Sequence, residues 1–128
     1  MEDTNMSLKE QQVEALQVLT EYSVKLIKGM KTSAEELMGC RKEDTDEFLR
    51  MVLDGVNWEL NVLNGCLSLI NEEEKVLDKN RANETILDFQ QVFSSKNDEA
   101  ISKAITEKLI PLVEQITEAA QKTVNKNS

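Results

Sequence analysis

The residues from Thr45 to Ile70, TDEFLRMVLDGVNWELNVLNGCLSLI, decide the fold of this chain. At about 100° per residue in an α-helix, their apolar side chains fall on one face, and most of their Asn and Asp side chains fall on the opposite face. The apolar stripe comprises Phe48, Leu49, Val52, Val56, Leu60, Leu63, Leu67 and Ile70. A stripe this broad contacts more than one neighbour, so we predict that the stretch is the central helix of the protein.

The composition of the whole chain favours helices. Its 128 residues include only 4 Gly and 1 Pro, and aromatic residues make up only 4%. Helix-forming residues such as Leu, Glu, Lys and Gln dominate, which leaves little material for strands. We predict an all-α protein with a single domain over residues 1–128, in which residues 1–6 and 122–128 are frayed.

A long helix is predicted before the central one. Ser7 and Glu10 form a capping-box pattern at its start, and apolar residues recur every three or four positions as far as Leu37. Gly39 is a typical helix stop. A second capping-box pattern that begins at Ser33 leaves open a kink or a short break in this helix.

Two further helices are predicted after the central one. Residues 71–82 form a long connection, and a short third helix follows over residues 82–93. The fourth helix is capped by Asn97 or Asp98. Pro111 lies on its solvent-facing side and should bend it toward the core.

This pattern predicts an antiparallel four-helix bundle with up-down-up-down topology, a short third helix and a proline-bent fourth helix. The alternative is a set of three long helices with residues 82–93 lying across one end.

The charge and the composition exclude several classes of function. The net charge of −9 disfavours nucleic acids and anionic membranes, which bind through Lys and Arg. The chain has no His and only 2 Cys, so we expect no metal and no cofactor. The polar N-terminus resembles neither a signal peptide nor a membrane span, and we expect a reduced, cytoplasmic setting.

Glu59 is the one carboxylate within the apolar side of the central helix. Gly55, Val56, Leu63 and Cys66 surround it on the helical wheel, so we expect it to be buried. A buried carboxyl group needs a hydrogen bond, a cation or a raised pKa. It is either a general acid or ligand contact in an inter-helix cleft, with Tyr22 or a Lys as its partner, or a structural oddity beside a groove.

A second apolar ridge on the central helix comprises Met51, Trp58, Val62 and Leu69. It lies roughly 100–120° from the main stripe. The ridge either packs against another helix or forms an exposed surface for a partner helix or a second copy of the chain. We select this ridge as the candidate partner-binding surface.

Three segments together resemble an uncharacterised family of small bacterial all-helical proteins, known as a domain of unknown function. The segments are residues 22–30 with KLIKGM, residues 54–58 with DGVNW, and residues 108–114 with KLIPLVE. The resemblance implies a helical bundle and no established activity.

From these observations we expect a protein that is not an enzyme. The first hypothesis is a cytoplasmic protein-interaction module, an adaptor or chaperone-like bundle that binds a helical partner. The alternatives are a homo-oligomeric structural bundle, and a small-molecule binder or enzyme that uses Glu59 in a cleft.

Overall fold

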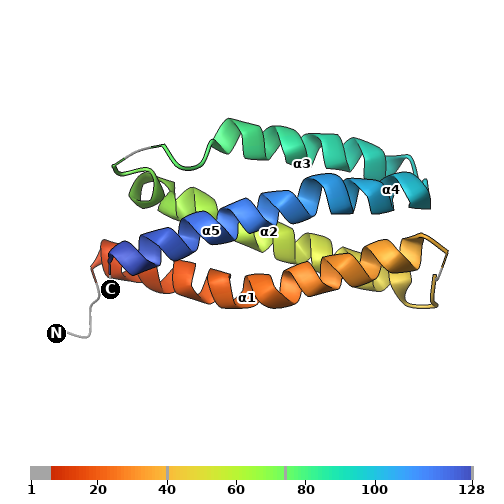
Figure 1. The fold of residues 1–128 in the computed structure, drawn as a ribbon, viewed down its shortest axis with the longest axis horizontal. Coiled ribbons are helices and arrows are strands. Elements are labelled where there is room, and N and C mark those ends of the chain that lie inside the picture. The colour runs from red at the N-terminus through yellow and green to blue at the C-terminus, as the bar shows by residue number, and fades with distance from the viewer. Residues whose placement is uncertain (1–6, 40, 74, 128) are drawn as a thin grey trace.

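The structure, a computed structural model, describes residues 7–39, 41–73 and 75–127. The described residues are overwhelmingly helical and include no strand, so the prediction of an all-α bundle is confirmed. The elements are α1 (Leu8–Leu37), α2 (Thr45–Ile70), α3 (Lys79–Ser94), α4 (Asp98–Ala104), η1 (Ile105–Leu109) and α5 (Ile110–Lys126). Successive helices run in opposite directions, and α4, η1 and α5 together form one long, continuous path (Figure 1).

The first helix begins as its sequence predicts. The Ser7 hydroxyl accepts from the backbone N–H of Glu10, and the Glu10 carboxylate accepts from the N–H of Ser7. The helix runs without a break through Ser33, which is buried. Gly39 follows its end with φ 123°, a conformation that glycine adopts without a steric penalty.

The helices do not contribute equally to the bundle. The long helix α1 packs against both α2 and α5, and α2 also contacts α5. By contrast, α3 lies mainly on α4 and η1. In Figure 1, α2 and α3 are close together at the loop that joins them and diverge toward the other end of the molecule. The result is a closed three-helix core with α3 leaning on one side of it.

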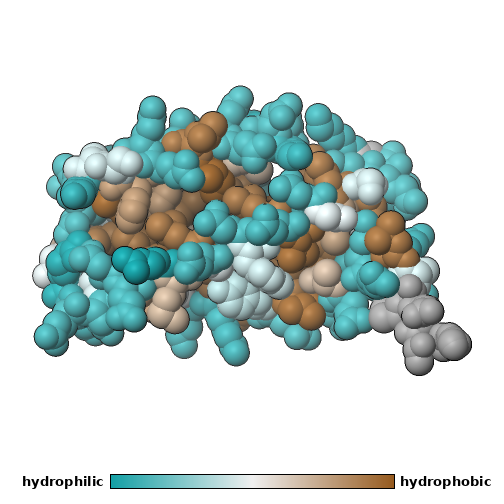
Figure 2. Space-filling model, turned by 180° about the vertical axis from the view of Figure 1, so that it is seen from behind, coloured by the Kyte–Doolittle hydropathy of each residue, from teal (hydrophilic) through white to brown (hydrophobic). Residues whose placement is uncertain are grey.

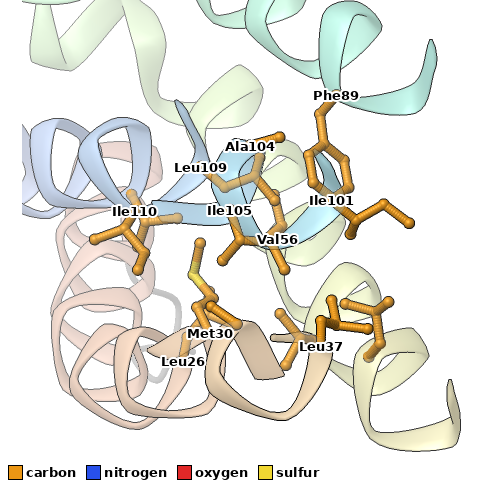
Figure 3. Close-up of a cluster of buried hydrophobic side chains, with 14 residues drawn as sticks. Leu26, Met30, Leu37, Val56, Phe89, Ile101, Ala104, Ile105, Leu109 and Ile110 are labelled. Carbon is orange, nitrogen blue, oxygen red and sulfur yellow. The ribbon is translucent and has the colours of Figure 1, made fainter. Parts of the chain in front are cut away.

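The core consists of two apolar clusters along the bundle. One lies where α1, α4, η1 and the first half of α2 meet, and Phe89 reaches into it from α3 toward Ile101 (Figure 3). The other lies between α5 and the opposite ends of α1 and α2. Leu60 and Ile86 pack against both clusters. Burial of these stripes supplies the main driving force for folding.

The third helix is longer than predicted, because its cap lies before residue 82, where the helix was expected to begin. The Asp78 carboxylate accepts from the backbone N–H groups of Asn80 and Arg81, so the helix begins at Lys79. The connection therefore spans residues 71–78 rather than 71–82. Asn71 organises it, since its amide donates to the carbonyl of Leu77 and its side-chain oxygen accepts from the N–H groups of residues 76 and 77.

Pro111 is accommodated by a π-helical turn, which the sequence pattern did not predict. Asn97 caps α4 as predicted, and its side-chain oxygen accepts from the N–H of Ala100. The backbone then widens over Ile105–Leu109 before it returns to α-helix at Ile110. A π turn amounts to one extra residue in a helix, and it relieves the clash between a proline ring and the preceding turn. Pro111 itself is only partly exposed.

The C-terminal end is more ordered than expected. Helix α5 continues to Lys126, and Thr123 and Val124 are buried, so the prediction that residues 122–128 fray is wrong for residues 122–126. The Lys126 ammonium group lies 3.2 Å from the carboxylate of Glu73. Residues 1–6, the other end expected to fray, lie outside the described residues.

If the π turn is one inserted residue, removing one residue there should preserve the bundle. We expect deletion of exposed Glu107 combined with Pro111→Ala to leave a cooperative thermal transition and a helical circular-dichroism spectrum, because α4 and α5 keep their register. Deletion of exposed Glu118, within regular helix, rotates the residues after it by about 100° and should abolish the transition. Equal damage from the two deletions would contradict this account of the π turn.

Candidate functional site

Glu59 lies at the seam between α1 and α2 and has no solvent-exposed surface. The prediction that it is buried is confirmed. It occupies the flank of α2 that faces α1, one turn after Gly55. A Cβ atom at Gly55 would collide with the hydroxyl of Tyr22 and lie 3.0 Å from a methyl group of Leu26. The glycine therefore lets the two helices approach closely beside the carboxyl group.

The hydrogen bonds at the seam identify the partner of Glu59 as Ser23 rather than Tyr22. The Ser23 Oγ atom is 2.7 Å from Oε2 of Glu59 and 2.9 Å from the carbonyl oxygen of Leu19. A serine hydroxyl carries a single hydrogen and cannot donate to both oxygens fully. A protonated Glu59 resolves the competition, because its O–H donates to Ser23 while Ser23 donates to Leu19. No group in the described part of the chain forms a hydrogen bond with the second carboxyl oxygen, Oε1.

The electrostatics of the seam agree with a neutral carboxyl group. Burial raises the pKa of Glu59 to about 7, against the smaller opposing effect of the hydrogen bond from Ser23. Burial also raises the pKa of Tyr22, and the charges of Glu59 and Asp54 act in the same direction. The seam is thus a place where a negative charge is disfavoured.

The four residues of the ridge that was selected as a partner-binding surface differ in their exposure to solvent. Met51 and Trp58 have exposed fractions of 62% and 40%, whereas Val62 is partly buried against the core and Leu69 is buried. Trp58 also packs edge-to-face on Tyr22 of α1, with ring centroids 5.5 Å apart. Leu69 therefore cannot belong to an exposed surface, and the four residues do not form one continuous patch.

A different apolar surface opens between α2 and α3. We call it the α2/α3 apolar face and define it by Leu53, Leu60, Ile86 and Phe93. The first three are partly buried against the core, and Phe93 is 40% exposed and stacks on Phe89 at 6.2 Å. Figure 2 shows the molecule from this side, with a broad apolar area bordered by hydrophilic side chains. Contiguous exposed apolar surface of this kind is typical of interaction sites.

Two polar residues border this face on α2. On the helical wheel, Asn57 and Asn64 lie beyond Leu53 and Leu60, about 40° further from the core. Both asparagines are exposed. Asn57 and Asn64 therefore line the edge of an apolar surface, and their amides can donate and accept hydrogen bonds there.

The sequence indicates the α2 side of the α2/α3 apolar face. Leu53 and Leu60 are seven residues apart on the flank of α2 opposite the Trp58 ridge, and a complete bundle would have covered them with α3. That α3 leans away from α2 is a property of tertiary packing, and no single-helix pattern encodes it.

A groove lies on the other side of α3. It has a volume of about 720 Å³ and runs between residues 75–85 and residues 107–122 of α5 and the π turn. Pro111 and Leu112 are among the residues that line it, and the charged side chains around it include Arg81 and Lys108. Thus α3 stands away from α5 as well as from α2.

None of the helices in the described part of the chain is long and apolar enough to cross a membrane. Within the same residues, no group of three His, Cys, Asp or Glu side chains is placed to hold a metal ion.

Comparison with known proteins places the chain in a family. The family model described as a domain of unknown function, DUF8042, matches residues 14–119, and the chain belongs to this family. This confirms the resemblance to an uncharacterised domain of unknown function. No curated protein and no solved structure matches the chain.

The raised pKa of Glu59 makes a prediction about pH and stability. Its pKa is about 7 in the folded protein and 4.5 without burial, so the folded state holds a proton that the unfolded chain releases between these values. This contribution is complete below pH 4.5 and is lost as the pH rises through 7. Relative to Glu59→Gln, the wild type should gain about 2 kcal/mol of unfolding free energy between pH 8 and pH 5, measured by urea denaturation.

The Gln variant is the reference because its side chain does not titrate, so the pH dependence of all other groups cancels in the difference. An identical pH dependence in the two proteins would show that Glu59 is ionised in the fold. Glu59→Leu should fold and be at least as stable as the wild type at pH 8, because Ser23 retains its bond to Leu19.

The close approach of α1 and α2 at Gly55 predicts that substitutions at Gly55 and Tyr22 have non-additive effects on the free energy of unfolding. Gly55→Ala should cost about 1–3 kcal/mol in unfolding free energy, because the new methyl group displaces the Tyr22 ring. In a Tyr22→Phe background the cost should fall, since the hydroxyl that collides is gone. Gly65→Ala is the matched control in the same helix, with nothing within 4 Å of the added carbon, and should stabilise by about 0.5–1 kcal/mol. Additive effects of the Gly55 and Tyr22 substitutions would refute the contact.

Proposed function

We propose that this member of the DUF8042 family is a non-catalytic protein-interaction module that binds a helical segment of another protein on its α2/α3 apolar face. The observation that carries the proposal is the divergence of α2 and α3, which leaves an apolar surface at a place where a bundle would accept another helix. A helix in this position would make the contacts with α2 that α3 does not make. We further propose that the protein works in the cytoplasm.

The arrangement suits recognition of a helix. Leu53 and Leu60 on α2, and Ile86 and Phe93 on α3, repeat at intervals of seven residues. Side chains at this spacing lie on one side of a helix, so the two rows form opposite walls that can contact one apolar stripe. Exposed Phe93 is the best candidate for an energetic hot spot because aromatic anchors dominate such interfaces. The amides of Asn57 and Asn64 provide a polar edge.

The two alternatives from the sequence gain less support. An enzyme or small-molecule binder that uses Glu59 requires access to a carboxyl group with no exposed surface. Met51 and Trp58 remain exposed, but Trp58 is engaged with Tyr22 and the ridge is interrupted. A homo-oligomer would cover the same α2/α3 apolar face with a second copy of the chain, and the experiment below separates it from a foreign partner.

A photo-crosslinking amino acid at position 93, introduced in the native cells, should capture a protein partner. The same amino acid at position 87 is the control, because Leu87 is an apolar residue of α3 that is 62% exposed and lies about 120° from Phe93 on the helical wheel. In addition, Phe93→Glu should weaken capture of the same partner from position 53 about thirtyfold, as expected for a hot spot worth ~2 kcal/mol, whereas Leu87→Glu should not.

Equal capture from positions 87 and 93 would contradict a role for the α2/α3 apolar face. Capture of only a second copy of the chain would replace the foreign partner by a homo-oligomer. Thermal unfolding of both Glu variants checks that any loss of capture does not result from unfolding.

A further inference from the structure

Charge surrounds the α2/α3 apolar face unevenly. Helices α2 and α3, which carry this face, diverge toward the end of the molecule where α2 begins and α3 ends (Figure 1). The segments around this end, residues 41–58 and 83–99, contain nine acidic and four basic residues. More than half of the net charge of −9 therefore comes from these two segments.

Few of these acids are neutralised within the protein. Arg41 bridges Asp46 of α2 and Asp98 of α4, at 2.8 and 2.9 Å. Among the described residues the other seven acids have no ion-pair partner, and all seven are exposed. They are Glu43, Asp44, Glu47, Asp54, Glu84, Asp88 and Glu99. The groove on the other side of α3 differs, since Lys75, Arg81, Lys108 and Lys122 lie around it beside three acids.

From this distribution we infer that the partner of the α2/α3 apolar face is a basic amphipathic helix. The inference rests on the proposed function and specifies the chemistry of its ligand. Apolar side chains of the partner would lie between Leu53 and Phe93, and Lys or Arg side chains on its flanks would meet the acids around the open end. A field of this sign accelerates association with a cation-rich segment and selects against an acidic one.

Two synthetic peptides test the inference. Both are amphipathic helices of about 18 residues with Leu at the same positions, and the polar positions carry Lys in one and Glu in the other. We expect the Lys peptide to bind at least tenfold more tightly at low salt by fluorescence anisotropy. The difference should shrink when the salt rises from about 50 to about 500 mM, because salt screens exposed charges.

A matched pair of variants localises the effect. Glu43→Lys with Glu47→Lys reverses two exposed acids at the open end, where α2 begins, and Glu14→Lys with Glu21→Lys reverses two exposed acids on the distant half of α1. Both pairs change the net charge equally. The first should remove most of the preference for the Lys peptide, and the second should leave most of it. Equal loss in the two would show that only the overall charge acts, and would overturn the inference.

The remaining outcomes separate this inference from the proposed function. Equal binding of both peptides, weakened in each case by the neutral substitution Phe93→Ser, would overturn the charge preference and leave the helix-binding face intact. Binding of the Lys peptide that Phe93→Ser does not weaken would place the peptide elsewhere and overturn the inference. Binding of neither peptide would also overturn it, and capture of a foreign helical protein from position 93 would then show that the proposed function survives.

Discussion

The packing of α1 against both α2 and α5 is the interaction on which the rest of this structure depends. The apolar stripe of α1 fills the space between α2 and α5, so these three helices form a complete core. The third helix in the sequence then has no central position to occupy. It rests on α4 and the π turn with only Ala82 and Phe89 buried, and apolar surface stays open beside it.

The same packing explains how the protein tolerates a buried acid. Gly55 brings α1 close to α2, and this closeness removes water from Glu59 and places Ser23 within hydrogen-bond distance. A charged carboxylate would be costly there, whereas a neutral acid joins a chain of hydrogen bonds that ends at a backbone carbonyl. The residue that looked most like a catalytic group is thus accounted for by the contact between two helices.

Much of the fold followed from local patterns, and the site followed only in part. The capping box at Ser7, the positive φ of Gly39, the stripe of α2 and the burial of Glu59 depend on interactions within a helix or on helical periodicity, and sequence reports these directly. The hydrogen-bond partner of Glu59 and the start of α3 depend on which of several nearby side chains forms the hydrogen bond. The π turn depends on how the backbone accommodates Pro111. The open α2/α3 apolar face depends on the relative placement of whole helices, which no single stripe records.

The slight anchoring of α3 also bears on how the molecule moves. Two buried side chains, the Asp78 cap and the bonds of Asn71 hold this helix, while the other helices share an extensive core. Protein segments with few buried contacts open as separate cooperative units at a lower free energy than global unfolding. Helix α3 is therefore the segment whose amide protons should exchange earliest as a group, and a ligand bound between α2 and α3 would slow that exchange by holding the helix closed.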